Sequence, residues 1–184
     1  LYNWCMKTYL ILLRGINVGG KNTVSMATLR EHLEKLGYAN VTTYINSGNV
    51  ILSSHKSVKA IQTEIESLLP KYYKLDTDLI KVLVLSHEQL RAVVDKRPKG
   101  FGGKPDVYHS DAIFLIDIRL EDAMAVFAPR DGIDKVWPGV GVIYSQRLSA
   151  ERTKSRLGKI IGTPAYKSMT IRSWNTVTKL LTLL

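Results

Sequence analysis

The apolar positions in the first half of the chain switch between a strand-like and a helix-like period, which predicts a β-α-β-β-α-β order. The first strand is a nearly continuous apolar run, as buried strands are, and the first helix has Ser25 as its cap and Gly37 as its stop. The second helix is expected to end before Pro70. The expected elements cover residues 8–13, 26–36, 41–45, 49–53, 58–68 and 79–85.

The second half carries a less regular pattern. Ser86 and Gln89 form a capping box for a helix, and residues 96–106, with four basic residues, two prolines and three glycines, predict a mobile loop. Further strands are expected over 107–117, 136–140 and 141–145, and further helices over 120–127, 151–161 and 173–183.

These elements indicate an α+β fold. We expect a ferredoxin-like βαββαβ N-terminal half over residues 6–86, with a second, less regular α+β half over residues 87–184 packed against it. Two halves and one compact domain are both compatible with a chain of 184 residues. Residues 1–5 precede Met6, which we interpret as the natural start, and we leave them out of the functional reasoning.

The composition is that of an ordinary globular protein, and its apolar runs are too short to span a bilayer, so no membrane partner is expected. The single cysteine, Cys5, excludes an internal disulfide framework and a cysteine-based zinc site. No secretory signal is recognisable, and together these features predict a cytoplasmic location. The four histidines show no metal-ligand spacing, so no metal-binding residues are expected, and any cofactor stays unknown.

The net charge of +10 is concentrated at the two ends of the chain. Residues 1–25 carry three basic residues and no acid, residues 147–184 carry eight basic residues and one acid, and the part between them is balanced. Such segregation favours an anionic partner, either a small molecule or a nucleic acid. A basic, solvated surface without a specific partner is the alternative.

The first candidate site is the glycine-rich run from Arg14 to Asn22, which follows the first strand. Its glycines allow backbone N–H groups to converge on an anion, and its basic side chains add charge. From Gly15 the run reads G-x-x-x-x-G-K-Asn, one residue from a phosphate-binding P-loop, but Asn22 lacks the hydroxyl that holds magnesium. A generic phosphate or carboxylate site and a purely structural turn therefore both stay open. The candidate ligand-binding residues here are Arg14, Asn17, Gly19, Gly20, Lys21 and Asn22.

The second candidate site is the turn between the two hairpin strands. Tyr44, Ser47 and Asn49 offer hydrogen-bonding groups beside Gly48, although asparagine and glycine also satisfy the turn itself. Ser47 has neither a nucleophile-elbow sequence nor an activating partner nearby, which disfavours it as a nucleophile. Catalytic residues stay unknown, and whether the protein is an enzyme stays open.

The third candidate site is the basic C-terminal segment. Arg152, Arg156 and Lys159 recur at helical spacing, which predicts a basic helix face. The aromatic side chains of Tyr166 and Trp174 could stack on nucleic-acid bases, although a solvated helix with Trp174 in the core is the alternative. Further candidate residues in this segment are Lys154, Lys167, Arg172, Trp174 and Asn175.

Two long runs resemble a known family. Residues 14–22 (RGINVGGKN) and 43–49 (TYINSGN) are similar to the bacterial family of unknown function numbered 1697, and so are the tail motifs over 162–166 and 170–177. Ser173 departs from the asparagine expected in the tail. The resemblance implies an α+β fold and a bacterial cytoplasmic protein, and it implies no established activity.

Three hypotheses follow from the sequence. The first is a binding protein in which the glycine-rich loop, with Arg14 and Lys21, holds a phosphate or carboxylate, and Arg172 or Lys154 completes the pocket. The second is nucleic-acid binding through the basic C-terminal helix. The third is an enzyme of unknown reaction that uses the 44–49 turn. A pure interaction module is a further alternative, and the sequence leaves the oligomeric state undetermined.

Overall fold

A computed structural model describes residues 6–184, so the interpretation of residues 1–5 as an added extension lies outside the described part. The chain forms two compact units. The first extends to Leu90 and includes Leu180–Leu184, and the second comprises Arg91–Lys179. The structure is α+β, as the sequence predicts.

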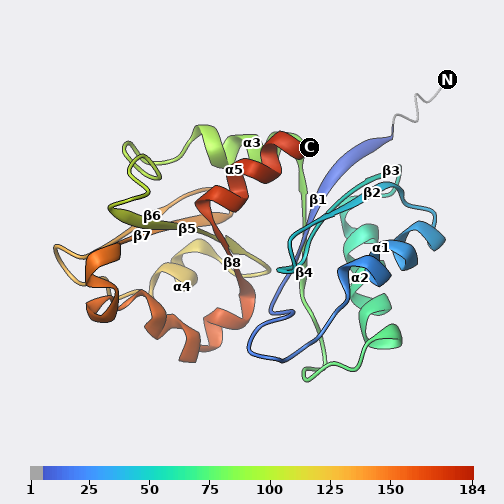
Figure 1. Cartoon of the computed structure of the whole chain (residues 1–184), viewed down its shortest axis with the longest axis horizontal. Helices are drawn as coiled ribbons and strands as arrows, with labels where there is room; N and C mark the ends of the chain where they lie inside the picture. Colours follow the sequence, from blue (N-terminus) through green and yellow to red (C-terminus); the bar gives the residue numbers. More distant parts are fainter. Residues whose placement is uncertain (1–5) are drawn as a thin grey trace. The chain divides into compact units, whose positions relative to one another are not determined.

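The first unit has the predicted β-α-β-β-α-β order and continues into a third helix (Figure 1). Its four strands form one antiparallel sheet in the order β2-β3-β1-β4. Helices α1 and α2 cover one face of this sheet (Figure 1). The ferredoxin-like comparison itself stays a prediction. The elements are β1 (Lys7–Leu13), α1 (Met26–Lys35), β2 (Ala39–Tyr44), β3 (Asn49–Ser54), α2 (Val58–Tyr72), β4 (Val82–Ser86) and α3 (His87–Asp95).

The central strand β1 explains the core of this unit. Ile11 pairs with Val50 of β3 on one side and with Val84 of β4 on the other, and all three side chains are buried. Leu29 of α1 and Ile61 of α2 are fully buried against the same cluster. The apolar residues that recur at helical spacing in α1 and α2 are thus the ones that pack against the sheet.

Helix α2 corrects one expectation, because it continues through Pro70 to Tyr72 instead of ending before the proline. Proline removes one backbone hydrogen bond, and close to a helix end this loss is small compared with burying a large apolar side chain. Leu69 is fully buried, and its carbonyl accepts a hydrogen bond from the N–H of Tyr73 at 2.9 Å. Packing of Leu69 thus keeps the last turn helical.

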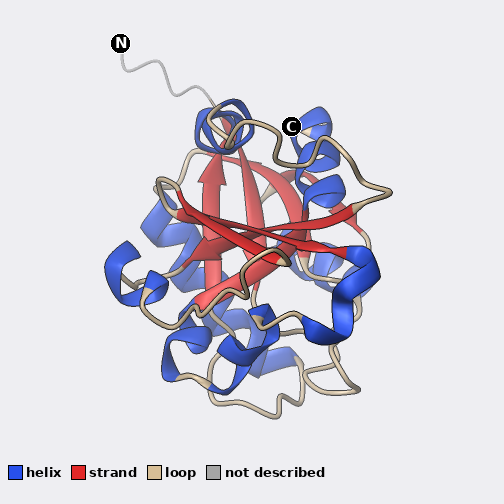
Figure 2. Ribbon diagram, turned by 90° about the vertical axis from the view of Figure 1, so that its left-hand side faces the viewer, coloured by secondary structure: helices blue, strands red, loops and turns tan. Residues whose placement is uncertain are grey.

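The second unit repeats the strand order of the first. Its sheet is antiparallel, with the order β6-β7-β5-β8, and its helices pack against the strands (Figure 2). Strand β8 was not predicted from the sequence, and the ends of the predicted strands shift by a few residues. The elements are β5 (Tyr108–Leu115), α4 (Leu120–Met124), β6 (Asp134–Pro138), β7 (Val142–Leu148), three 3₁₀ segments η1 (Ser149–Lys154), η2 (Leu157–Gly162) and η3 (Pro164–Ser168), β8 (Met169–Ser173) and α5 (Trp174–Leu183).

An aromatic cluster fills one face of the second sheet. Phe101 is 2% exposed, and its ring lies edge-on to those of Tyr144 and Trp174, with centroids 5.2 and 5.0 Å away. The Tyr144 hydroxyl donates to the carbonyl of Val93 at 2.7 Å. Loop 96–106, expected from its composition to be mobile, is therefore anchored at its centre by a buried aromatic residue.

The predicted basic helix over 151–161 is wrong. The segment forms η1 and η2, and Ser155 between them is extended, with φ −61° and ψ 142°. The cause is Asp134, whose carboxylate accepts hydrogen bonds from the backbone N–H groups of Arg130 at 2.9 Å and Arg156 at 2.8 Å. A helix through Arg156 would need that N–H for its own ladder, so Asp134 holds the break open.

The charge on Asp134 also affects stability. Burial acts to raise the pKa of this carboxyl, but the two backbone donors, the Ser155 hydroxyl and Arg130 outweigh it, so its pKa is lowered overall. A lowered folded-state pKa contributes stability that is present above the unfolded-state value and is lost as the pH falls through the folded-state value.

We therefore expect Asp134→Asn to reduce the free energy of unfolding at pH 7 by roughly 1–3 kcal/mol, the usual cost of weakening buried charge-assisted hydrogen bonds. The difference from the wild type should be smaller at pH 3 than at pH 7, because a group with a lowered folded-state pKa loses its stabilising effect as the pH falls below the ordinary aspartate pKa. Urea unfolding at both pH values measures this, with the exposed Asp131→Asn as a control. A difference that stays constant from pH 7 to pH 3 would contradict the assignment.

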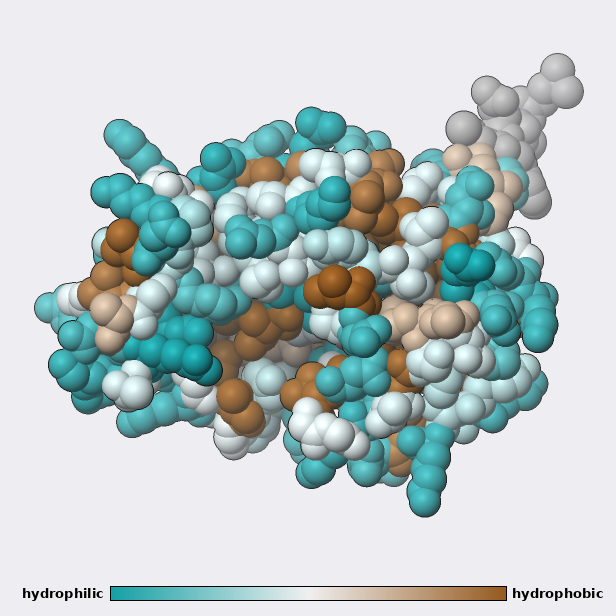
Figure 3. All heavy atoms as spheres, viewed as in Figure 1, coloured by the Kyte–Doolittle hydropathy of each residue, from teal (hydrophilic) through white to brown (hydrophobic). Residues whose placement is uncertain are grey.

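No helix in the described part of the chain is both long and apolar enough to cross a membrane. On the face drawn in Figure 3, hydrophilic residues are spread over each unit and hydrophobic ones form scattered groups.

Candidate anion-binding site

The glycine-rich run after β1 folds into a small hairpin. The N–H of Lys21 donates to the carbonyl of Val18 at 3.1 Å, and the two residues between them, Gly19 and Gly20, have φ values of 58° and 75°. Two successive left-handed residues form the tight turn that glycine adopts at the lowest cost. The turn therefore accounts for the presence of two glycines. Both glycines are exposed at the tip of the hairpin.

Asn17 fixes this hairpin in place. Its side-chain Nδ2 donates to the carbonyl of Val24 at 2.9 Å and to that of Asn46 at 2.8 Å, while its Oδ1 accepts from the N–H of Val24 at 2.8 Å. Both side-chain hydrogens are used within the protein. The structure therefore gives Asn17 a positioning role in the loop.

Asn22 ties the other end of the hairpin to the segment before β4. This side chain is 6% exposed; its Nδ2 donates to Gly15 at 3.0 Å, and its Oδ1 accepts from the N–H of Asp76 at 2.8 Å. The Asp76 carboxylate in turn accepts from the N–H of Asn22 at 2.6 Å. The residue that stands where a P-loop has its magnesium-binding hydroxyl is thus a buried structural link.

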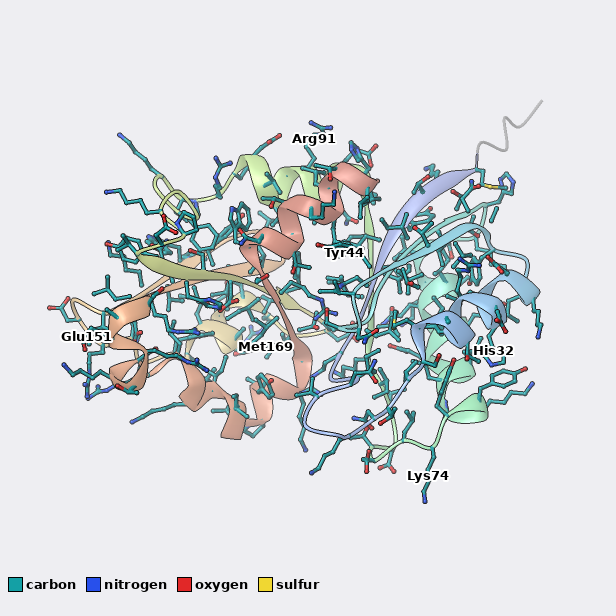
Figure 4. The ribbon with its side chains drawn as sticks, in the orientation of Figure 1. His32, Tyr44, Lys74, Arg91, Glu151 and Met169 are labelled. Carbon is teal, nitrogen blue, oxygen red and sulfur yellow. The ribbon has the colours of Figure 1, made fainter. Side chains whose placement is uncertain are left out.

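The residues of the 44–49 turn also have structural roles in the turn itself. Asn49 is fully buried, and its Nδ2 donates to the carbonyl of Tyr44 at 3.0 Å and to the hydroxyl of Ser47 at 2.9 Å. Gly48 has φ +81°, and a side chain there would approach Leu13 Cβ to 2.9 Å. Tyr44 lies at the end of β2, where this turn begins (Figure 4).

The structure brings the two motifs together, because Asn17 bonds to Asn46. Beside this bond is an open pocket of about 600 Å³. Of the predicted residues, Asn17 and Gly20 line it. The remaining lining residues were not predicted as a site, although the Ser25 cap in the sequence places a helix start close to the loop. They are Thr23, Val24, Ser25, Met26, Ala27 and Asn46.

The pocket meets the N-terminus of α1. Ser25 caps this helix by accepting a hydrogen bond from the N–H of Thr28 at 3.3 Å. The N–H groups of Met26 and Ala27 have no acceptor among the described residues, and the first turn carries no acid. Free amides and the positive end of a helix dipole favour a negatively charged group. Lys21, exposed on the hairpin, adds a positive charge to the loop.

The predicted residues of the C-terminal segment belong to the second unit. Arg172 is 6% exposed, donates to Thr170 Oγ1 at 2.9 Å and to the Ile171 carbonyl at 2.8 Å, and has its pKa lowered to about 10 by burial. Lys154 pairs with Glu151 at 2.8 Å. Glu151, labelled in Figure 4, belongs to η1.

Trp174 and Asn175 open α5. Trp174 is 6% exposed in the aromatic cluster, in agreement with the core alternative, while Asn175 is exposed. The contribution of Lys154 or Arg172 to the site of the glycine-rich loop stays a prediction.

Residues 6–144 match the family described as "Protein of unknown function (DUF1697)". The chain belongs to this family. A solved structure with a similar fold is that of the conserved bacterial protein SP0830 from Streptococcus pneumoniae, which is 28% identical in sequence, with a TM-score of 0.83 over 97% of this chain and 99% of that chain. No curated protein matches the chain at a significant level. Among the described residues, no group of three or more histidine, cysteine, aspartate or glutamate side chains gathers to hold a metal ion.

The role of Asn22 can be tested by Asn22→Ser, which would complete the P-loop sequence. Because serine cannot make both side-chain bonds and the position has φ 48°, we expect the free energy of unfolding to fall by roughly 1–3 kcal/mol without a gain of magnesium-dependent ATP binding. Denaturant unfolding and calorimetric titration with Mg-ATP measure both effects.

Asn40→Ser is the matched control, since Asn40 has φ 52° but makes one side-chain bond, of 3.3 Å, to Ser53. It should cost clearly less stability than Asn22→Ser. Equal losses would contradict the structural role of Asn22, and tight Mg-ATP binding by the Asn22 variant would contradict the exclusion of a P-loop.

Proposed function

We propose that this protein binds a small phosphate- or carboxylate-bearing ligand at the pocket between the glycine-rich hairpin, the Asn46 turn and the N-terminus of α1. The observation that carries the proposal is that Met26 and Ala27, whose N–H groups have no acceptor within residues 6–184, line a pocket that also contains Gly20. The lining comes from the glycine-rich run, from the segment that leads into α1 and its first turn, and from the Asn46 turn.

The chemistry of the pocket fits an anion with several oxygen atoms. Backbone N–H groups donate to such oxygens without a charge of their own, and the hydroxyls of Thr23 and Ser25 lie in the same lining. Lys21 supplies a full positive charge by long-range attraction, and Arg14, half-buried at the end of β1, supplies another. The openness of the pocket suits a ligand whose anionic group is held and whose remainder extends into solvent.

The alternatives have less support. Nucleic-acid binding through a basic helix loses its structural basis, since Arg152, Arg156 and Lys159 do not share one helix. An enzyme built on the 44–49 turn would need Ser47 and Asn49, which bond to each other and close the turn. An anion-binding protein uses the same two motifs without displacing any of these contacts.

A charge placed in the pocket tests the proposal. Ala27→Glu puts a carboxylate in the first turn of α1, where it should stabilise the helix by roughly 0.3–1 kcal/mol and repel an anionic ligand. We expect stability to be kept or raised while affinity falls by about tenfold or more. Thermal shift and calorimetry with inorganic phosphate, acetate, sugar phosphates and mononucleotides measure the two effects on one sample.

Ala60→Glu is the matched control, because Ala60 lies in the first turn of α2 behind the equivalent cap, Ser57, and outside the pocket. It should raise stability similarly and leave affinity within about twofold. The proposal fails if no anion of the panel stabilises the wild-type protein, or if the two variants weaken binding equally.

A further inference from the structure

The second unit contains its own pocket, of about 90 Å³, at the start of β5 and beside the first turn of α5. Trp174 forms an apolar wall, and Gly102 packs on it so closely that an added Cβ would lie 2.3 Å from the indole ring. The polar lining comes from Tyr108, His109, Ser110, Ser173 and Asn175. None of the residues that line this pocket is acidic.

His109, which lines the pocket, belongs to a charged trio whose other two members, Asp111 and Arg147, lie outside the lining. His109 and Asp111 are two residues apart on β5 and so share one face of the sheet. His109 Nε2 donates to Asp111 Oδ1 at 3.1 Å, and Arg147 Nη1 of the neighbouring β7 lies 3.7 Å from the other carboxylate oxygen. The Asp111 side chain is 15% exposed, while that of His109 is 45% exposed. The carboxylate is thus mostly buried, and the imidazole is the more solvent-exposed partner.

This arrangement fixes the chemistry of the free ring nitrogen. A carboxylate only accepts hydrogen bonds, so Nε2 carries the hydrogen that points to Asp111. Neutral His109 then has a lone pair on Nδ1, and protonation turns Nδ1 into a second donor. With Asp111 and Arg147 charged, the trio is neutral while His109 is neutral and carries one positive charge when the ring is protonated.

Of the other charged groups near the pocket, Lys135 adds a positive charge, while Lys104 and Asp106 balance each other. Burial raises the pKa of Asp111, against the opposing effects of His109 and Arg147. The ammonium group of Lys135, on β6, lies 6.0 Å from the ring centre of Tyr108, which lines the pocket. The turn that leads into β5 carries Lys104 and Asp106, one of each sign, on either side of the lining residue Pro105.

We propose that this pocket is a second, independent anion site, which takes a small carboxylate or phosphate group on the protonated His109 and the side-chain amide of Asn175. The hydroxyl of Ser173, also in the lining, bonds to Thr176 Oγ1 at 2.9 Å and accepts from the Thr176 N–H at 3.3 Å. The site goes beyond the proposed function, since it belongs to the second unit and shares no residue with the glycine-rich loop. Its distinguishing property is that the protonated imidazole binds an anion more tightly than the neutral one, because protonation adds a positive charge and a second donor.

Inorganic sulfate is a suitable probe, because it stays a dianion at pH 5.5 and pH 8.0, and acetate serves as the carboxylate probe. Titration of the ¹⁵N-labelled full chain, followed at the indole N–H signal of Trp174, reports on this pocket alone. We expect binding to be about tenfold tighter at pH 5.5 than at pH 8.0, and the Ala27→Glu background to give the same curves.

His109→Gln keeps a donor for Asp111 but cannot take up a proton, so its affinity at pH 5.5 should fall to the value measured at pH 8.0. Asn175→Asp adds a negative charge at an exposed position and should weaken binding at both pH values. Lys99→Gln is the control, because Lys99 is exposed in loop 96–106 but does not line the pocket. This variant should change affinity by less than about twofold.

The absence of any Trp174 shift at either pH would overturn the proposal. A pH dependence that survives in His109→Gln would overturn it as well. Unchanged Trp174 curves in the Ala27→Glu protein would support the independence of the two sites, and curves weakened by that variant would contradict it.

Discussion

The carboxamide of Asn17 is the contact on which the candidate site depends. One side chain joins the start of the hairpin, the residue before the helix cap and the carbonyl of Asn46. These three points belong to two runs of sequence that are about thirty residues apart. A carboxamide can do this because it carries two donors and an acceptor in one plane, and no aliphatic or charged side chain of similar size does the same. The pocket exists because this contact holds both loops beside α1.

The periodicity of apolar residues predicted most of the first unit, since each strand or helix there is buried on the face that the pattern shows. The prediction failed where a contact distant in sequence decides the local structure. Asp134 cannot be recognised from residues 151–161, yet it takes the N–H of Arg156 and breaks the helix. Strand β8 was missed for a related reason, because its five residues gain their β structure from pairing with β5, far away in the chain.

The candidate site was predicted in part. The glycine-rich loop and the Asn46 turn were recognised as motifs, and the Ser25 cap was recognised as a helix start, but their meeting in one pocket required the fold. Asn22 and Asn49 were predicted as ligand-binding residues because each offers a hydrogen-bonding side chain near a glycine. In the structure they are 6% and 0% exposed, and their side chains bond within the loops, which sequence alone could not indicate.

Both sheets have the same strand order, but the connection before the last strand differs between them. In the first unit it contains the fifteen-residue helix α2, whose turns form and melt together. In the second it contains three short 3₁₀ segments, each of five or six residues. Short segments with separate anchors can open one at a time, at a lower free energy than a long helix. The helix α2 is therefore expected to open as one cooperative unit, and the segment η1–η3 in separate steps. Amide hydrogen exchange would then be faster over residues 149–168 than over α2.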